Sequence, residues 1–396
     1  RMDPVSRVYL DHNATTPLRA DARAAMVAAM DVVGNPSSVH AEGRAAKMLV
    51  ERARGQVAAL VGCKPTQVVF TGSATEAAAL AVAQKGRHGG VFAALPTEHD
   101  CLLDWSEADL PALFDETGSL DASAASQFTN WIMQRVGDAY STERGSVALV
   151  AMSAANSETG VTLPNGCVAP NNHVNAFRAG TVPFAVVCDI TQLAGKMPVT
   201  YEGDARPSYM ILSSHMLGVP KGVGALINFT ADDPEPMLRG GGQEMGRRSG
   251  TENVISIAGF GAAAETAQAD VEAGKWDCVE KLRNILESAL AAASNTTIFV
   301  GKEAHRLPNT SCFATSGWKG ETQVMQMDLA GFAISAGSAC SSGKVKASRV
   351  LQAMGLGEVA GDAVRVSLGL ETTEEDVMRF AEAWARKLKK HEARAA

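Results

Sequence analysis

Apolar residues recur along this chain with two spacings, one typical of buried strands and one typical of helices. Short, nearly continuous apolar runs predict strands at Gln67–Thr71, Gly90–Leu95, Val147–Met152, Phe184–Cys188, Tyr209–Leu212 and Gly224–Asn228. Helical spacing occurs at Asp21–Val32, Ala41–Val61 and Thr75–Gln84. Strands that alternate with helices predict an α/β fold, in which helices flank a mainly parallel, doubly wound sheet.

The pattern changes after Asn228, where a glycine-rich loop and longer helical stretches follow. The later predicted elements are helices at Trp276–Ala293, Arg349–Met354 and Thr372–His391 and strands at Cys312–Thr315 and Ala363–Ser367. We therefore expect a large domain over residues 16–255 and a smaller α/β domain over residues 256–396. Residues 1–15, which include a short strand from Val8, are predicted to join the smaller domain.

Length and composition fit two domains of an ordinary globular protein. The chain has 396 residues, 46% apolar and 20% charged, whereas a single core rarely grows beyond about 250–300 residues. The net charge is −7 and no long basic run occurs, which argues against nucleic acid as a partner. No apolar run reaches the roughly 18 residues of a membrane span, and no charged and then apolar leader opens the sequence.

The cysteines favour a reducing compartment. There are seven, an odd number, and no two have the CxxC spacing. This pattern disfavours a disulfide framework and a structural zinc site, so we expect a cytoplasmic protein without a metal.

Polar side chains follow five of the predicted strands. Thr75, His99, Asn156, Asp189 and His215 each come shortly after a strand ends. Because open α/β sheets bind ligands at the carboxyl edge of their strands, we expect these side chains to gather there.

Three of these positions suit pyridoxal phosphate. The helix start at Thr75 offers N–H groups to a phosphate, an acid such as Asp189 keeps the pyridine nitrogen protonated, and the flat imidazole of His99 can stack on the ring. Gln192 and Asn156 are candidates to hydrogen-bond the ring hydroxyl. Taken singly, an Asp after a strand is more often a turn or a cap, but five coincident strand ends favour the cofactor.

Eleven ordered motifs extend over nearly the full length of the chain. They are YLDHNATTP (Tyr9–Pro17), NPSSVHAEGR (Asn35–Arg44), FTGSATEA (Phe70–Ala77), TEH (Thr97–His99), ANSETG (Ala155–Gly160), DITQLAGK (Asp189–Lys196), SSH (Ser213–His215), PKGVGAL (Pro220–Leu226), GGGQEMGRRSGTEN (Gly240–Asn253), GSACSSG (Gly337–Gly343) and RVSLG (Arg365–Gly369). With these motifs the sequence resembles the cysteine desulfurases of the class V aminotransferase family, in the NifS and IscS branch. The resemblance implies fold type I of the pyridoxal-phosphate enzymes, with that cofactor and L-cysteine as substrate.

The resemblance also implies how the cofactor phosphate is held. Ala74, Thr75, Ser213 and His215 would bind it within one subunit, and Thr251 would reach it from the partner subunit of a homodimer.

The cofactor ring and the substrate would be held by a second set of positions. The resemblance implies that Asp189 pairs with the pyridine nitrogen, Gln192 with the ring oxygen, and that His99 stacks on the ring. Asn156 and Arg365 would hold the substrate carboxylate, a role that suits a bidentate guanidinium.

Cys340 lies in the GSACSSG motif, which is similar to the long-loop form of the family's cysteine loop. The resemblance implies that its thiolate attacks the substrate sulfur, releases L-alanine and keeps a persulfide for an acceptor protein. The pathways that such a persulfide serves include iron–sulfur cluster assembly.

Five positions depart from the family pattern. The family carries a lysine directly after the histidine of SSH, which forms the Schiff base and moves the α-proton, and here that position is Met216. Lys221 follows in a PKG turn that the family also has, so it is a poor substitute. The other departures are Ala77, Ala78, Ser157 and Met245.

Three hypotheses about function follow. The first is a cysteine desulfurase, because Cys340 and Arg365 are both present. The second, which Met216 motivates, is a non-catalytic or diverged protein that binds pyridoxal phosphate without turnover. The third is another class V reaction, such as transamination or selenocysteine cleavage.

Overall fold

The structure is a computed structural model that describes residues 7–119, 121–139, 146–163, 184–201, 206–337 and 347–395. Within these ranges the helices are α1 (Ala20–Met30), α2 (Ala41–Val61), α3 (Ala74–Val82), α4 (Asp100–Leu103), α5 (Ala122–Ala139), α6 (Val254–Glu272), α7 (Lys275–Ala293), α8 (Gly320–Asp328), α9 (Arg349–Ala353) and α10 (Glu374–Ala395). The strands are β1 (Val8–Tyr9), β2 (Val68–Thr71), β3 (Phe92–Ala94), β4 (Leu149–Ser153), β5 (Ala185–Asp189), β6 (Tyr209–Ser213), β7 (Gly224–Asn228), β8 (Thr297–Phe299), β9 (Thr310–Thr315), β10 (Phe332–Ala333), β11 (Ser335–Ala336) and β12 (Ala363–Ser367). The bounds of α2, β7 and β12 are those that the sequence predicts.

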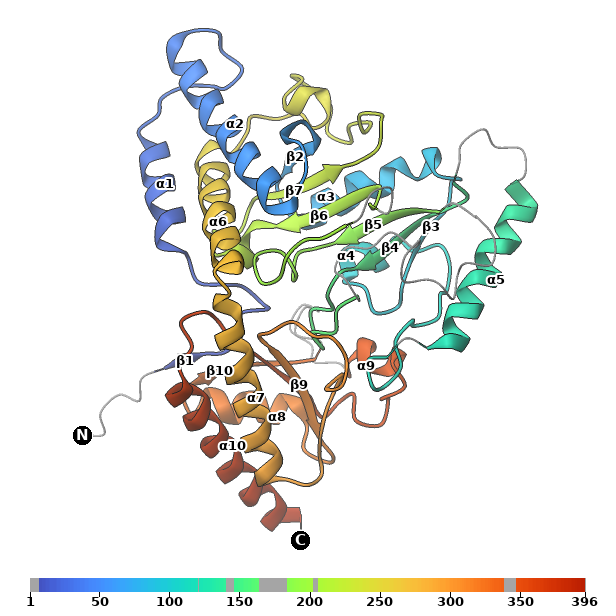
Figure 1. Ribbon diagram of the computed structural model, residues 1–396, viewed down its shortest axis with the longest axis vertical. Coiled ribbons are helices and arrows are strands. Elements are labelled where there is room, and N and C mark those ends of the chain that lie inside the picture. The colour runs from blue at the N-terminus through green and yellow to red at the C-terminus, as the bar shows by residue number, and fades with distance from the viewer. Residues whose placement is uncertain are drawn as a thin grey trace.

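A six-stranded sheet in the order β2-β7-β6-β5-β4-β3 forms the centre of the molecule (Figure 1). The four strands from β3 to β6 are parallel, which confirms the predicted mainly parallel sheet. Strand β7 is antiparallel to both of its neighbours, β6 and β2, a reversal that we did not predict. The connection from β6 to β7 spans residues 214–223 only, and parallel neighbours need a crossover of about a dozen residues or more.

Both faces of this sheet are buried. Along β5, Val186 and Cys188 lie in one apolar cluster with side chains of α2, α5 and α6. Val187, between them, lies in a second cluster with side chains of α3 and α4. Successive side chains of a strand point to opposite faces, so this strand is apolar throughout because helices cover it on both sides.

A second sheet lies in the other half of the molecule, below the six-stranded sheet in Figure 1. It is antiparallel, in the order β11-β12-β9-β8, and β1 pairs in parallel with β10 beside it. Helices α7 and α10 pack on each other, and their side chains share an apolar cluster with Val8, Phe313 and Val366. The expected small α/β domain corresponds to this region in its architecture.

The domain boundary that we predict between residues 255 and 256 stays a prediction. Helix α6, which begins at this boundary, packs on α1 and α2 (Figure 1). Its side chains Phe260 and Ala264 lie in the apolar cluster of the six-stranded sheet. These contacts favour a boundary after α6 rather than before it.

Within the ranges given above, no helix combines the length and the apolar character that crossing a bilayer requires.

Candidate active site

A cavity of about 450 Å³ opens at the carboxyl ends of five strands of the six-stranded sheet. Strands β2 to β6 all end at this edge, and the reversed strand β7 begins there. Ten of the predicted site residues line the cavity: Ala74, Thr75, His99, Asn156, Asp189, Gln192, Ser213, His215, Met216 and Arg365. The expectation that the polar strand ends gather at one edge is thus met by the positions of these side chains.

The start of α3 forms one wall of the cavity. The first N–H groups of a helix have no acceptor within the helix, and the hydroxyl of Ser73 accepts a hydrogen bond from the N–H of Glu76 (3.1 Å). Gly224 brings the beginning of β7 against this helix start, since a Cβ built on it would lie 2.7 Å from the nitrogen of Ala74. Ser213 and His215, which are close to Met216 in the sequence, also line the cavity. The result is a set of N–H, hydroxyl and imidazole groups suited to an anion.

Asp189 is a buried carboxyl at the end of β5. Its Oδ1 accepts a hydrogen bond from the N–H of Thr191 (2.8 Å), and burial raises the pKa of the carboxyl. Among the described residues no Lys or Arg forms an ion pair with it. A carboxylate in such a place is stabilised by a positively charged partner.

His99 stands at the rim and begins α4. Its Nδ1 accepts a hydrogen bond from the N–H of Cys101 (3.1 Å), which fixes the ring at the helix start. The preceding residue, Glu98, is fully buried and accepts hydrogen bonds from the N–H (2.8 Å) and the hydroxyl (2.5 Å) of Ser153. Burial raises the pKa of Glu98 to about 7.

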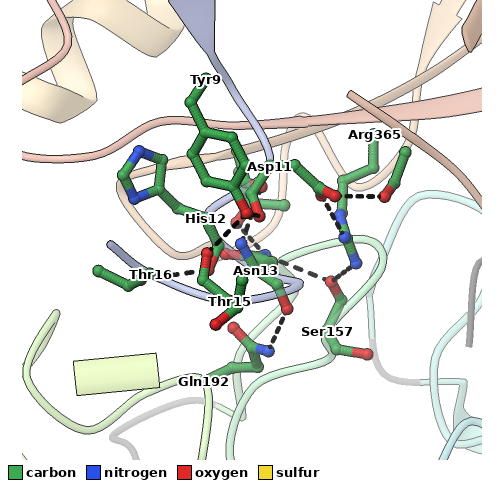
Figure 2. A network of polar contacts seen from close by, with 12 residues as sticks. Tyr9, Asp11, His12, Asn13, Thr15, Thr16, Ser157, Gln192 and Arg365 are labelled. Atoms are coloured by element: carbon green, nitrogen blue, oxygen red, sulfur yellow. Dashed lines mark hydrogen bonds and ion pairs between the residues drawn. The ribbon is translucent and has the colours of Figure 1, made fainter. Parts of the chain in front are cut away.

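Asn156 and Arg365 line the cavity, but much of their hydrogen-bonding capacity is already used. Asn156 accepts from the N–H groups of Glu158 and Thr159 at Oδ1 (both 2.9 Å) and donates from Nδ2 to the carbonyl of Thr97 (2.9 Å). Arg365 donates from Nη1 to the carbonyl of Ser157 (2.9 Å), as Figure 2 shows. One N–H of the Asn156 amide therefore has no acceptor within the described ranges and can bind a ligand.

The guanidinium of Arg365 also keeps donors without a partner in the described part of the chain. Its Nη2 donates to Oδ1 of Asp11 (2.7 Å), whereas its Nε is buried without a hydrogen-bond partner among the described residues. A buried donor without a partner is costly, and a bound anion would satisfy it.

Gln192 belongs to a buried network around Asn13 (Figure 2). Its Nε2 donates to the carbonyl of Asn13 (3.0 Å), and its Oε1 accepts from Nζ of Lys196 (3.0 Å). The side chain of Asn13 in turn donates to the hydroxyl of Thr310 (2.8 Å), and its N–H donates to the hydroxyl of Ser367 (2.9 Å). Asn13 therefore joins strands β9 and β12 of the second sheet to the cavity.

Met216 separates the cavity from a second, smaller one of about 110 Å³ and lines both. It is half-buried, and its Sδ lies 3.7 Å from Nε2 of Gln192. The second cavity is also lined by His12, Lys196 and Trp276. Lys221, the other nearby lysine, is exposed at the rim of the larger cavity.

One described site residue of the prediction, Thr251, is not brought to this cavity. Thr251 is exposed in the glycine-rich loop and does not line it. Cys340 lies outside the described residues. The residues nearest to it in the chain that the structure describes are Gly337 and, in the following segment, Ala347 just before the start of α9.

Two of the departures from the family pattern are packing positions. Ala77 and Ala78 are fully buried in the apolar cluster that holds α3 on the sheet. Met245 is exposed, with its backbone in the left-handed region at φ 60°. Ser157 contributes its backbone carbonyl to the network of Arg365 (Figure 2).

The sequence interpretation missed Asn13 and Lys196. Both belong to quoted motifs, and Lys196 follows Gln192 by four residues, the spacing of one helical turn. That spacing is a signal for contact between the two side chains. Asn13 could not be found in this way, because its partners come from distant parts of the chain.

Comparison with known proteins places the chain in a family. The model of the family described as aminotransferase class-V matches residues 8–380. The chain is 35% identical to a cysteine desulfurase of Cereibacter sphaeroides over 384 residues, which cover 96% of this chain and 95% of that relative. It is 38% identical to a cysteine desulfurase of Frankia sp. (strain EuIK1) over 398 residues, with 96% and 90% covered.

A solved structure agrees with the sequence relatives. The NifS-like protein of Rickettsia africae superimposes with a TM-score of 0.80 and 27% identity, over 97% of this chain and 99% of that one. The α/β fold, the cavity at its carboxyl edge and the sequence relatives agree, and the chain belongs to the class V aminotransferase family, among its cysteine desulfurases.

Proposed function

We propose that this protein is a pyridoxal-phosphate-dependent cysteine desulfurase that forms L-alanine and a persulfide on Cys340. The observation that carries the proposal is the gathering of His99, Asp189 and Arg365 around one cavity at the carboxyl edge of the sheet. The names of relatives that match more than nine-tenths of the chain support it.

The groups around the cavity fit the cofactor in their chemistry. The carboxyl of Asp189, with which no Lys or Arg of the described residues forms an ion pair, would receive its positive partner from the protonated pyridine nitrogen. The N–H groups at the start of α3, together with Ser213 and His215, would hold the phosphate. His99 would stack on the ring, and Gln192 would donate to the ring oxygen.

When bound, the cofactor supplies an electron sink for the bonds that break in the substrate. Arg365 would bind the substrate carboxylate through the side of its guanidinium that carries the unpartnered Nε. The remaining N–H of Asn156 would complete this contact. Both side chains are held by the protein before the substrate arrives, which lowers the cost of ordering them.

Cys340 would receive the sulfur. Its thiolate attacks the sulfur of L-cysteine, the new S–S bond forms as the C–S bond breaks, and the substrate carbon takes up a proton to become L-alanine. The sulfur then leaves the persulfide to the thiol of an acceptor protein.

Met216 favours a second candidate function. A thioether can neither bond to the aldehyde of the cofactor nor carry a proton, so the chain as it stands would bind the cofactor through non-covalent contacts alone. On this reading the protein is a diverged, non-catalytic binder of pyridoxal phosphate. Its cofactor would leave on dialysis.

A comparison of the protein with its Met216→Lys variant tests both functions. Each is incubated with pyridoxal phosphate and L-cysteine, and alanine and the mass of the Cys340 peptide are measured, with Cys340→Ser as the control. If Met216→Lys forms alanine and a persulfide, the site is that of a cysteine desulfurase. If the protein without the substitution forms the same products, it is itself active. Absence of both products from Met216→Lys contradicts the desulfurase.

We further propose that the protein is a cytoplasmic homodimer that supplies sulfur to an acceptor such as an iron–sulfur scaffold protein. The exposed Met237, Leu238 and Met245 flank or belong to the glycine-rich loop that carries Thr251, and they support a partner subunit at this surface. Sedimentation of Met245→Glu tests this idea, since a charge at a subunit interface shifts the protein toward the monomer. The proposal is contradicted if Met245→Glu remains a dimer. It is also contradicted if the protein without the substitution is a monomer.

A further inference from the structure

Lys196 is a buried lysine without a carboxylate partner among the described residues. It is 4% exposed, and its Nζ lies 3.0 Å from the carbonyl of Gln192, 3.0 Å from Oε1 of the same residue and 3.5 Å from Oδ1 of Asn13. Burial, and then the charge of Arg365, lower the pKa of its amine to about 7. A buried amine without a counterion costs stability, so its contacts need an explanation.

Two of the three contacts go to one residue. Nζ of Lys196 binds the amide of Gln192 at Oε1, and the carbonyl of Asn13 binds the same amide at Nε2. A backbone carbonyl can only accept, and the amine offers hydrogens to both oxygens of Gln192. If the amide were flipped, its oxygen would face the carbonyl oxygen of Asn13, and its NH₂ group would face the amine of Lys196. Asn13 and Lys196 together therefore fix one orientation of the amide.

The fixed orientation determines what Gln192 offers to the cavity. Its NH₂ group lies between the carbonyl of Asn13 and the side chain of Met216, which lines the cavity. The amide thus presents N–H, and its oxygen is turned toward Lys196. A ligand oxygen at this place meets a donor.

We propose that Lys196 is a positioning residue, which locks the amide of Gln192 so that its NH₂ group faces the oxygen of the bound cofactor ring. This inference rests on the proposed function, because it names the cofactor as the ligand. Lys196 itself does not line the larger cavity. It acts through Gln192.

The first test reads the amide directly in the cofactor-free protein. The ¹⁵N side-chain amide signals of Gln192 are assigned by their loss in Gln192→Met. We expect them to be dispersed in the unchanged chain and in the control Lys319→Met, whose lysine pairs with Asp362 elsewhere. In Lys196→Met they should merge with the signals of solvent-exposed glutamines. Signals that stay in place in Lys196→Met overturn the proposal.

The second test measures the dissociation constant of pyridoxal phosphate by its absorbance. Lys196→Met should weaken cofactor binding about tenfold, which corresponds to the loss of one well-oriented buried hydrogen bond. In a protein that already carries Gln192→Met, the same substitution should weaken binding no further. If Lys196 is purely structural, its substitution would weaken cofactor binding equally with and without Gln192→Met, and this result would overturn the proposal. Where Lys196→Met alone does not fold, the comparison of Gln192→Met with the double variant gives the same decision. If the unchanged chain binds no cofactor, the proposed function fails, and the amide signals still decide the role of Lys196.

Discussion

Nη2 of Arg365 lies 2.7 Å from Oδ1 of Asp11, and the second oxygen of that carboxylate accepts a hydrogen bond from Ser335 (2.8 Å). Asp11 follows β1, whereas Arg365 lies in β12, so this ion pair joins two segments that are far apart in the sequence (Figure 2). The carboxylate holds the guanidinium in one place. The orientation of the proposed substrate-binding arginine therefore depends on a residue near the start of the chain.

Asp11→Asn removes the charge that holds Arg365 while keeping the shape of the side chain. Hydrogen bonds to charged groups contribute about 1.5–3 kcal/mol, so we expect a loss of stability up to this size. The dissociation constant of L-cysteine for the cofactor-loaded protein should rise about tenfold, and that of the cofactor should stay within about threefold. Absorbance titrations with both ligands measure this, with the exposed Asp109→Asn as the control. Equal losses for both ligands would show that Asp11 does not act on the substrate side.

Glu98→Gln changes how stability depends on pH. Burial raises the pKa of Glu98 in the folded protein from its ordinary 4.5 to about 7, so between these values the folded state keeps a proton that the unfolded state has lost. This group therefore makes the folded protein less stable as pH rises through that window. Glutamine cannot ionise, and its amide can replace the protonated carboxyl at Ser153.

The stability gain of Glu98→Gln over the unchanged chain should thus grow from pH 4.5 to pH 7 and level off above it. Urea unfolding of the cofactor-free proteins at several pH values measures the gain, with the exposed Glu358→Gln as the matched control. A gain that is constant across the window would disprove the assignment.

Much of the fold follows from local patterns, and the parts that do not have identifiable reasons. Helix α2 is a long periodic run and strands β7 and β12 are nearly continuous apolar runs of ordinary length, and the bounds of all three are confirmed. Strands β10 and β11 have two residues each, which is too short for any periodicity to show. The direction of β7 depends on the length of its connection to β6, a signal that is present in the sequence and that we did not use.

The site residues also fall into those that local patterns predict and those that depend on distant contacts. Thr75, Asp189 and His215 could be expected at one edge because strand ends in an open sheet share that edge. Which donors are still free at Arg365 and Asn156 depends on partners such as Asp11 and Thr97, which come from other segments. No local spacing encodes those contacts.

Gly337→Ala should destabilise the protein next to the segment that carries Cys340. A Cβ at this position would lie 2.4 Å from Oε1 of Glu158 and 2.8 Å from Cβ of Ser348, and both neighbours are buried. Overpacking of this kind costs about 1–3 kcal/mol. Thermal unfolding measures it, and Gly357→Ala, whose Cβ would have no neighbour within 4 Å, is the control. If the two variants melt at the same temperature, the close packing around Gly337 is refuted.

Arg54→Met should strongly destabilise the protein, because Arg54 belongs to a buried ion pair outside the cavity. Arg54 donates to both carboxylate oxygens of Glu244 (2.7 and 2.8 Å), and their side chains are 2% and 1% exposed. Removal of one partner of a buried pair costs about 3–5 kcal/mol, whereas replacement of both is often far milder. We expect Arg54→Met/Glu244→Met to recover part of the loss in urea unfolding, with the exposed Arg23→Met as a control. No recovery in the double variant would mean that Arg54 acts mainly through its bond to the carbonyl of Val68.

The hydrogen bonds of Asn13 connect the second sheet to the cavity. Its side chain and N–H are attached to Thr310 and Ser367 in the second sheet, and its carbonyl is attached to Gln192 at the cavity. If the second sheet rotated relative to the first, one of these bonds would stretch. The movement would then reach the amide of Gln192, which we propose to face the cofactor. The absorbance of pyridoxal phosphate bound there would then report on the relative position of the two halves of the molecule.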